Sequence, residues 1–157
     1  MDTDEINAFV QRECRSQFQG VYSIDNLPTI PRLLVCNTDP SYMPGRHWIA
    51  IYVSTTGYGK YFDSFGLPPN PIFEHYMNVH CRNWTFNTRC LQNLTSSFCG
   101  FYCCFYCILK CRGFDLTRIV RIFTRDTTFN DFIVYDFVCN GIPSRKLQFL
   151  RSKYKIG

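Results

Sequence analysis

One cysteine, Cys99, stands in the kind of sequence that a nucleophile requires. It is followed by Gly100 and opens the apolar run FYCCFYCILKC, and Gln92 lies seven residues before it. A cysteine attacks carbon as its thiolate, and a free thiol with a pKa of about 8.5 is only a few per cent ionised near neutral pH. A nucleophilic role for Cys99 therefore requires surroundings that lower the pKa of its thiol.

The first turn of a helix offers such surroundings. Residues 99–111 are apolar on every side except at Lys110, which predicts a buried helix. The Thr-Ser-Ser sequence at 95–97 supplies candidate caps, and Gly113 predicts the stop. Cys99 then lies in the first turn, where unpaired N–H groups and the helix dipole favour a negative sulfur.

A proton acceptor must come from one of the histidines at 47, 75 and 80. His47 begins HWIAIYV, in which alternate residues on both faces are largely apolar. That pattern predicts a strand covered on both sides, with His47 at its entry. His75 and His80 lie in PIFEHYMNVHC, which predicts a helix, and we interpret both as surface or hydrogen-bonded histidines.

Asp63 is the candidate partner of His47. The segment YGKYFDSFG predicts a second strand that ends at Asp63-Ser64 and pairs with the first as a hairpin. A four-residue turn at 54–57 places Ser64 opposite His47, whereas a three-residue turn or a bulge places Asp63 there. We therefore expect an odd-length turn or a bulge near Gly57, with Asp63 orienting the imidazole and stabilising its charged form.

Gln92 completes the set. A side-chain amide beside the backbone N–H of a nucleophile can bind the oxygen that becomes negative during acyl transfer, and losing one such donor costs about 2.7–4 kcal/mol. Each of His47, Asp63, Gln92 and Cys99 has an ordinary structural explanation when taken alone. Their conjunction is what predicts a catalytic site.

These residues resemble the adenovirus-type cysteine proteases (adenain), in which the order along the chain is also His, acidic residue, Gln, Cys. The specific parts are the spacing of seven from Gln92 to Cys99 and the doubled cysteine after the nucleophile. The resemblance covers roughly residues 1–140. The matching segments are Gly20-Val21-Tyr22, Asn37-Thr38 leading to His47-Trp48, Phe62-Asp63-Ser64-Phe65-Gly66, and Gln92 through Cys104.

Two departures refine the resemblance. Asp63 stands where the adenovirus pattern carries Glu. The related proteases for ubiquitin-like proteins also use Asp as the acidic residue. Those relatives usually carry Asp directly before the nucleophile, whereas Phe98 precedes Cys99 here, so the viral branch fits better. The chain is shorter than we expect of the adenovirus enzymes, which suggests a minimal version from another large DNA virus, a virophage or a Maverick-type element.

The resemblance implies a cysteine endopeptidase that cleaves viral capsid and core precursors during virion maturation. Its implied substrates carry a large apolar residue four positions before the cut and Gly near it. The implied locations are the host nucleus or a cytoplasmic virus factory, and the virion. Two alternatives stay open: a protease for ubiquitin-like modifiers, and a non-catalytic DNA- or capsid-binding structural protein that retains a dead protease fold.

The cysteines raise the alternatives of a metal site and of disulfides. Cys99, Cys103, Cys107 and Cys111 recur every four residues, but at 1.5 Å per residue the outer two lie about 18 Å apart along a helix, so they cannot bind one zinc ion. We expect no metal. By the resemblance, Cys81 is a candidate for a disulfide to an activating viral peptide, because it lies eleven positions before Gln92; the alternative is a plain thiol, and Cys90 is a weaker candidate.

The end of the chain is basic. Residues 144–157 gather positive side chains interleaved with Phe149 and Tyr154, which fits either a contact with double-stranded DNA or a solvated tail. The resemblance implies stimulation by DNA. The basic residues are Arg145, Lys146, Arg151, Lys153 and Lys155.

Composition agrees with a single domain spanning residues 1–157. The chain of 157 residues is 46% hydrophobic, which is ample for one core. We find no apolar signal core and no membrane span, and so expect a soluble monomer with reduced thiols. The expected fold is α+β and papain-like, with a small, mostly antiparallel sheet flanked by helices. We expect helices near 4–14, 71–81, 99–111, 115–123 and 128–141, and strands at 32–37, in the 47–63 hairpin and around 84–88.

Overall fold

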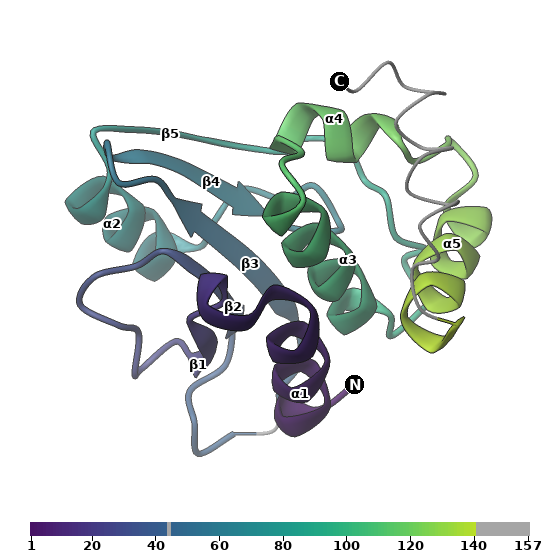
Figure 1. The fold of residues 1–157 in the computed structure, drawn as a ribbon, viewed down its shortest axis with the longest axis horizontal. Helices are drawn as coiled ribbons and strands as arrows, with labels where there is room; N and C mark the ends of the chain where they lie inside the picture. The colour runs from purple at the N-terminus through teal and green to yellow at the C-terminus, as the bar shows by residue number, and fades with distance from the viewer. Residues whose placement is uncertain (44, 141–157) are drawn as a thin grey trace.

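A computed structural model describes residues 1–43 and 45–140 of the chain (Figure 1). The basic segment 144–157 and the last position of the helix expected near 128–141 lie outside the described residues. Within the described part, no helix is long and apolar enough to cross a bilayer.

The described residues form an α+β fold in which a five-stranded sheet is flanked by helices. The predicted helices and strands are all present, within a few residues of the expected bounds. The elements in chain order are α1 (Thr3–Cys14), the 3-10 turn η1 (Arg15–Gln17), β1 (Gly20–Ser23), β2 (Leu33–Asn37), β3 (Trp48–Val53), β4 (Tyr58–Phe62), α2 (Pro71–His80), β5 (Asn83–Phe86), α3 (Cys99–Cys111), α4 (Leu116–Arg121) and α5 (Thr127–Asn140).

The sheet is mixed, with the strand order β1-β2-β3-β4-β5. The pairs β2/β3 and β3/β4 are antiparallel, whereas β1/β2 and β4/β5 are parallel. The prediction of a mostly antiparallel sheet was therefore wrong. The reason is connectivity: β1 was not expected as a strand, and helix α2 carries the chain back so that β5 runs in the same direction as β4.

Helices cover both faces of the sheet, as expected. Alternate residues of β2 and β3 point to opposite faces and enter two separate apolar clusters. The larger cluster joins the sheet to α1, α3, α4 and α5, and the smaller one joins it to α2. Figure 1 shows α2 apart from the other helices. Strand β3 is buried almost throughout, which confirms the prediction of a strand covered on both sides.

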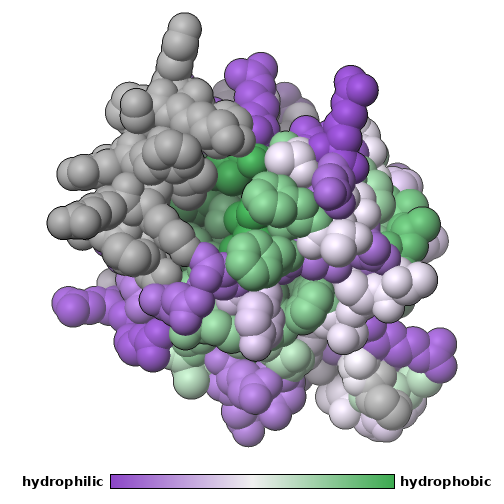
Figure 2. Space-filling model, turned by 90° about the vertical axis from the view of Figure 1, so that its right-hand side faces the viewer, coloured by the Kyte–Doolittle hydropathy of each residue, from purple (hydrophilic) through white to green (hydrophobic). Residues whose placement is uncertain are grey.

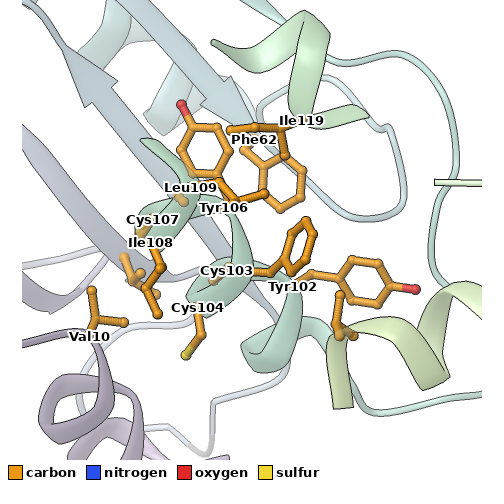
Figure 3. Packing of buried hydrophobic residues seen from close by; sticks show 14 of the residues in the cluster. Val10, Phe62, Tyr102, Cys103, Cys104, Tyr106, Cys107, Ile108, Leu109 and Ile119 are labelled. Atoms are coloured by element: carbon orange, nitrogen blue, oxygen red, sulfur yellow. The ribbon is translucent and has the colours of Figure 1, made fainter. Parts of the chain in front are cut away.

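Helix α3 is the central element of the larger cluster (Figure 3). It spans Cys99–Cys111 as predicted. Arg112 is its C-cap residue, and Gly113 follows with a φ of +95°, a conformation that favours glycine. Its start differs from the expectation, because Phe98 is the N-cap residue and no side chain caps the helix. The N–H groups of the first turn are thus free of a cap, on the side where Cys99 lies.

Helices α4 and α5 pack mainly against α3. Helix α5 is apolar on both sides: Val134 and Phe137 are buried, while Phe129, Phe132 and Tyr135 are exposed. Figure 2 views the molecule from the side on which α5 lies in Figure 1, and apolar residues gather on this face.

Candidate active site

The β3–β4 hairpin places His47 beside Asp63. The connection between the paired residues Val53 and Gly59 has an odd length, as predicted. Continuing this register puts Phe65, rather than Asp63, directly opposite His47, so the predicted pairing was wrong by two positions. Asp63 shares the face of Phe65 and reaches the imidazole diagonally, with 2.9 Å between His47 Nε2 and Asp63 Oδ1. The Phe65 ring stacks on the imidazole, with 5.0 Å between ring centroids.

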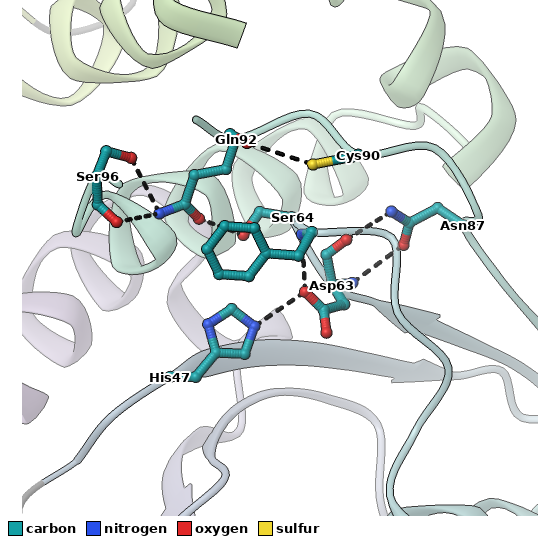
Figure 4. Close-up of polar contacts among 8 residues, drawn as sticks. His47, Asp63, Ser64, Asn87, Cys90, Gln92 and Ser96 are labelled. Atoms are coloured by element: carbon teal, nitrogen blue, oxygen red, sulfur yellow. Dashed lines mark hydrogen bonds and ion pairs between the residues drawn. The ribbon is translucent and has the colours of Figure 1, made fainter. Parts of the chain in front are cut away.

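Asp63 is held by hydrogen bonds to its carboxylate and to its backbone (Figure 4). The Phe65 N–H donates to Asp63 Oδ1 at 2.8 Å. The side-chain amide of Asn87 accepts the Asp63 N–H at 3.0 Å and donates to the Asp63 carbonyl at 2.6 Å. Sequence reasoning missed Asn87. It follows β5, and only the parallel pairing of β4 with β5 would have revealed that it lies beside Asp63.

Cys99 lies at the start of α3, where this helix packs on β3. Its side chain is largely buried, with the residue 8% exposed, yet it lines a cavity. A Cβ atom on Gly100 would meet Met1, Ile6 and Trp48 at 3.2–3.4 Å. The small residue after the nucleophile therefore leaves room for the side chains of Met1, Ile6 and Trp48 to pack against the start of α3.

The site lowers the pKa of the Cys99 thiol. Burial acts in the opposite direction, but hydrogen bonds from His47 and from the backbone N–H groups of Trp48 and Gly100, together with the imidazolium charge, outweigh it. One turn along the same helix, burial raises the pKa of Cys103 well above its usual range. Burial likewise raises the pKa of Cys104 and Cys107, so proximity to His47 distinguishes Cys99 from the fully buried cysteines of α3.

Asp63 and Cys99 together raise the pKa of His47 to about 9. Burial lowers this pKa, while the hydrogen bonds to Asp63 and Cys99 and the charges of both groups raise it. Because Nε2 is bonded to Asp63, Nδ1 is the ring nitrogen left to exchange a proton with Cys99. The arrangement favours a thiolate–imidazolium ion pair with Asp63 behind it.

Gln92 is fully buried between two serines (Figure 4). Its Oε1 accepts a hydrogen bond from the Ser64 hydroxyl at 2.6 Å. Its Nε2 donates to the Ser96 carbonyl at 3.0 Å and to the Ser96 hydroxyl at 3.1 Å. The expected oxyanion donor thus lies at the site, but its N–H groups are engaged by Ser96. Sequence reasoning did not assign these two serines to Gln92.

A cavity of about 320 Å³ joins these groups. His47, Gln92 and Cys99 line it, and Asp63 lies behind the imidazole. The structure therefore brings together the four side chains that the sequence singled out. The remaining lining residues are Met1, Gly45, Arg46, Trp48, Phe65, Ser96 and Ser97.

The other candidate residues lie elsewhere. Cys81 ends α2 and packs, half-buried, against the smaller cluster. Cys90 is half-buried, and its thiol donates to the Gln92 carbonyl. His75 is exposed on α2, and the ring of His80 packs on Tyr76. All ten cysteines, each within the described ranges, are free thiols.

Similarity to solved structures agrees with this fold. No protein-family model matches the sequence, and neither does any curated protein sequence. A crystal structure of the ASFV pS273R protease matches with a TM-score of 0.57 and 20% identity over 87% of this chain and 64% of that one. The selenomethionine form of that protease matches with a TM-score of 0.47 and 24% identity over 66% of this chain and 43% of that one.

The central domain of an uncharacterised protein, Lpg1148, from Legionella pneumophila matches with a TM-score of 0.52 and 12% identity, over 89% of this chain and 97% of that one. This chain spans less than two thirds of each ASFV protease chain. The similarity shows that the chain shares its papain-like fold with the ASFV pS273R protease. It does not single out the adenovirus-type enzymes.

Proposed function

We propose that this chain is a cysteine endopeptidase. The observation that carries the proposal is the placement of His47 between the Asp63 carboxylate and the Cys99 thiol, at the wall of a cavity. The lowered pKa of Cys99 and the raised pKa of His47 favour the reactive ionised pair. A structural protein with a dead protease fold has no need for this set of contacts.

In the proposed reaction the Cys99 thiolate attacks the carbon of the scissile peptide bond. The carbonyl π electrons move to the oxygen, which the Cys99 N–H and the Gln92 amide stabilise. The His47 imidazolium donates its proton to the leaving nitrogen as the C–N bond breaks, which leaves a thioester on Cys99. His47 then takes a proton from water, whose oxygen attacks the thioester carbon; the C–S bond breaks, which releases the acid product and restores the Cys99 thiolate beside the protonated His47. Asp63 orients the ring and stabilises its positive charge throughout.

Hydrolysis of a fluorogenic peptide ending in Gly-Gly tests the proposal. The wild-type chain should release the fluorophore, and Cys99→Ala should abolish release while leaving the fold intact. Cys103→Ala is the matched control, because Cys103 lies on the same helix and packs in the core. Full activity of Cys99→Ala would exclude the mechanism. Absence of turnover, together with absence of alkylation at Cys99, would favour the dead fold.

We further propose that the natural substrates are viral capsid and core precursors, cleaved at sites that carry an apolar residue and Gly. The support is the resemblance of the site residues to the adenovirus-type enzymes, together with the small cavity at Cys99, which suits residues with little side chain. Mass spectrometry of the fragments from a peptide library would give the cleavage preference. Cleavage of intact ubiquitin-like conjugates, without cleavage at apolar-x-Gly sites, would favour a protease for ubiquitin-like modifiers.

Activation by DNA and by a viral peptide remains a proposal from the resemblance. A salt-dependent affinity for duplex DNA, and faster peptide hydrolysis when DNA is added, would support a role for the basic residues 144–157. The free, half-buried thiol of Cys81 is the candidate for a peptide disulfide. Loss of peptide activation in Cys81→Ser, with unchanged basal hydrolysis, would support that assignment.

A further inference from the structure

Ser64 connects the acidic side of the site to its oxyanion side. The residue is 1% exposed and directly follows Asp63. Its hydroxyl donates to Gln92 Oε1 at 2.6 Å, since an amide oxygen only accepts hydrogen bonds. Its carbonyl accepts the N–H groups of Leu91 at 2.8 Å and Gln92 at 3.1 Å. Ser64 therefore holds both the backbone and the side chain of Gln92.

The bond from Ser64 has two physical consequences for the Gln92 amide. It fixes the rotation of the amide, because Oε1 must stay on Ser64 while Nε2 points to the opposite side. It also draws electron density toward Oε1, which makes the N–H groups of Nε2 stronger donors, because hydrogen bonds in a chain polarise one another.

The contacts of Nε2 show how such a donor would act. Nε2 donates to both the carbonyl and the hydroxyl of Ser96. If Nε2 exchanges that neutral hydroxyl for the negative oxygen of a tetrahedral intermediate, its hydrogen bond to the Ser96 carbonyl can stay in place. A hydrogen bond to an anion is stronger than one to a neutral hydroxyl, so the exchange favours the intermediate.

We infer that Ser64 is a positioning residue for the oxyanion donor: its hydroxyl holds and polarises the Gln92 amide without touching the substrate. This inference rests on the proposed endopeptidase function. A purely structural role would lower the stability of the fold but would leave the balance between ground state and transition state unchanged.

Kinetics of Ser64 variants test the inference. Ser64→Ala should lower kcat about 10-fold, between the effect of one neutral hydrogen bond and the roughly 10²–10³-fold cost of removing an oxyanion donor, with little change in KM. Ser64→Cys keeps a weak S–H donor and should fall between the wild type and Ser64→Ala. Ile51→Val is the control for stability alone, because Ile51 is buried in the smaller cluster on the far face of the sheet.

A peptide aldehyde gives a second readout. The Cys99 sulfur adds to the aldehyde carbon and forms a tetrahedral hemithioacetal. The former aldehyde oxygen of this adduct takes the position of the oxyanion that Gln92 is proposed to bind. Ser64→Ala should weaken the binding of the peptide aldehyde about 10-fold relative to the binding of the same peptide as an alcohol, in proportion to its effect on kcat. An unchanged ratio and an unchanged kcat, in a wild type that hydrolyses peptide and loses activity with Gln92→Ala, would overturn the role of Ser64 alone. A wild type without turnover would instead overturn the proposed function.

Discussion

Replacing Asp63 by asparagine should weaken the site without dismantling it. Oδ1 of Asp63 accepts hydrogen bonds from both His47 Nε2 and the Phe65 N–H. Because an amide nitrogen cannot accept from Phe65, the oxygen introduced by Asp63→Asn should stay in this position and keep the same imidazole tautomer. Only the charge is lost. A hydrogen bond to a charged group contributes roughly 1.5–3 kcal/mol, against roughly 0.5–1.5 kcal/mol for a bond between neutral groups. We therefore expect Asp63→Asn to lose about 1.4 kcal/mol of transition-state stabilisation.

That cost corresponds to about a tenfold loss of kcat/KM near neutral pH. It also changes the pH profile. The active form needs the protonated imidazole, so in the wild type activity should fall as the pH rises through about 9, the pKa of His47. Removing the Asp63 charge lowers that pKa, and the alkaline limb should move down by about one pH unit. The assay is kcat/KM for peptide hydrolysis across pH.

Asp131→Asn is the matched control for this prediction. Asp131 is also a buried carboxylate, but it accepts from the Tyr102 hydroxyl and has no contact with His47. Its replacement should leave the alkaline limb in place. An alkaline limb that does not move in Asp63→Asn, or that moves equally in Asp131→Asn, would refute the role of the Asp63 charge.

Two further predictions concern the support of the site. Asn87→Ala removes both hydrogen bonds to the Asp63 backbone and should lower the free energy of unfolding in urea by about 1–3 kcal/mol, together with peptide hydrolysis; unchanged values for both would show that this support is dispensable. Gly66→Ala should destabilise more than Gly113→Ala in the same assay. Both glycines have positive φ, but a Cβ on Gly66 would lie 2.6 Å from the Arg89 carbonyl, whereas one on Gly113 meets nothing within 4 Å. Equal losses would contradict the clash.

The sequence was most informative where one physical cause decided the structure. The apolar run at 99–111 could only be buried as a helix, and its bounds match α3. Strand β1, residues 20–23, was missed because four residues carry little alternation, and its parallel partner β2 is set by the tertiary fold. The odd number of residues in the hairpin turn was predictable. The last paired residues before the turn, Val53 and Gly59, were not, because composition does not show where the pairing of the two strands ends.

The same distinction applies to the candidate site. His47 and Cys99 have residue types and settings that are rare enough to suggest chemistry. Ser64, Asn87 and Ser96 do not, since polar residues after strands and before helices are common in loops. Their contacts depend on where distant segments meet: Asn87 reaches Asp63 only through the β4/β5 pairing, and the two serines meet the amide only once the site has formed.

The rate of alkylation at Cys99 tests the central claim, which is that His47 activates this thiol. The protein is alkylated with iodoacetamide at about pH 6.5 to 9, and mass spectrometry then gives the rate of modification at each cysteine. The rate at Cys99 is compared with the rate at the exposed Cys139. We predict that Cys99 reacts faster than Cys139 at the lower end of this range, and that His47→Ala removes this advantage. If Cys99 reacts no faster than Cys139, or equally fast without His47, the account is contradicted.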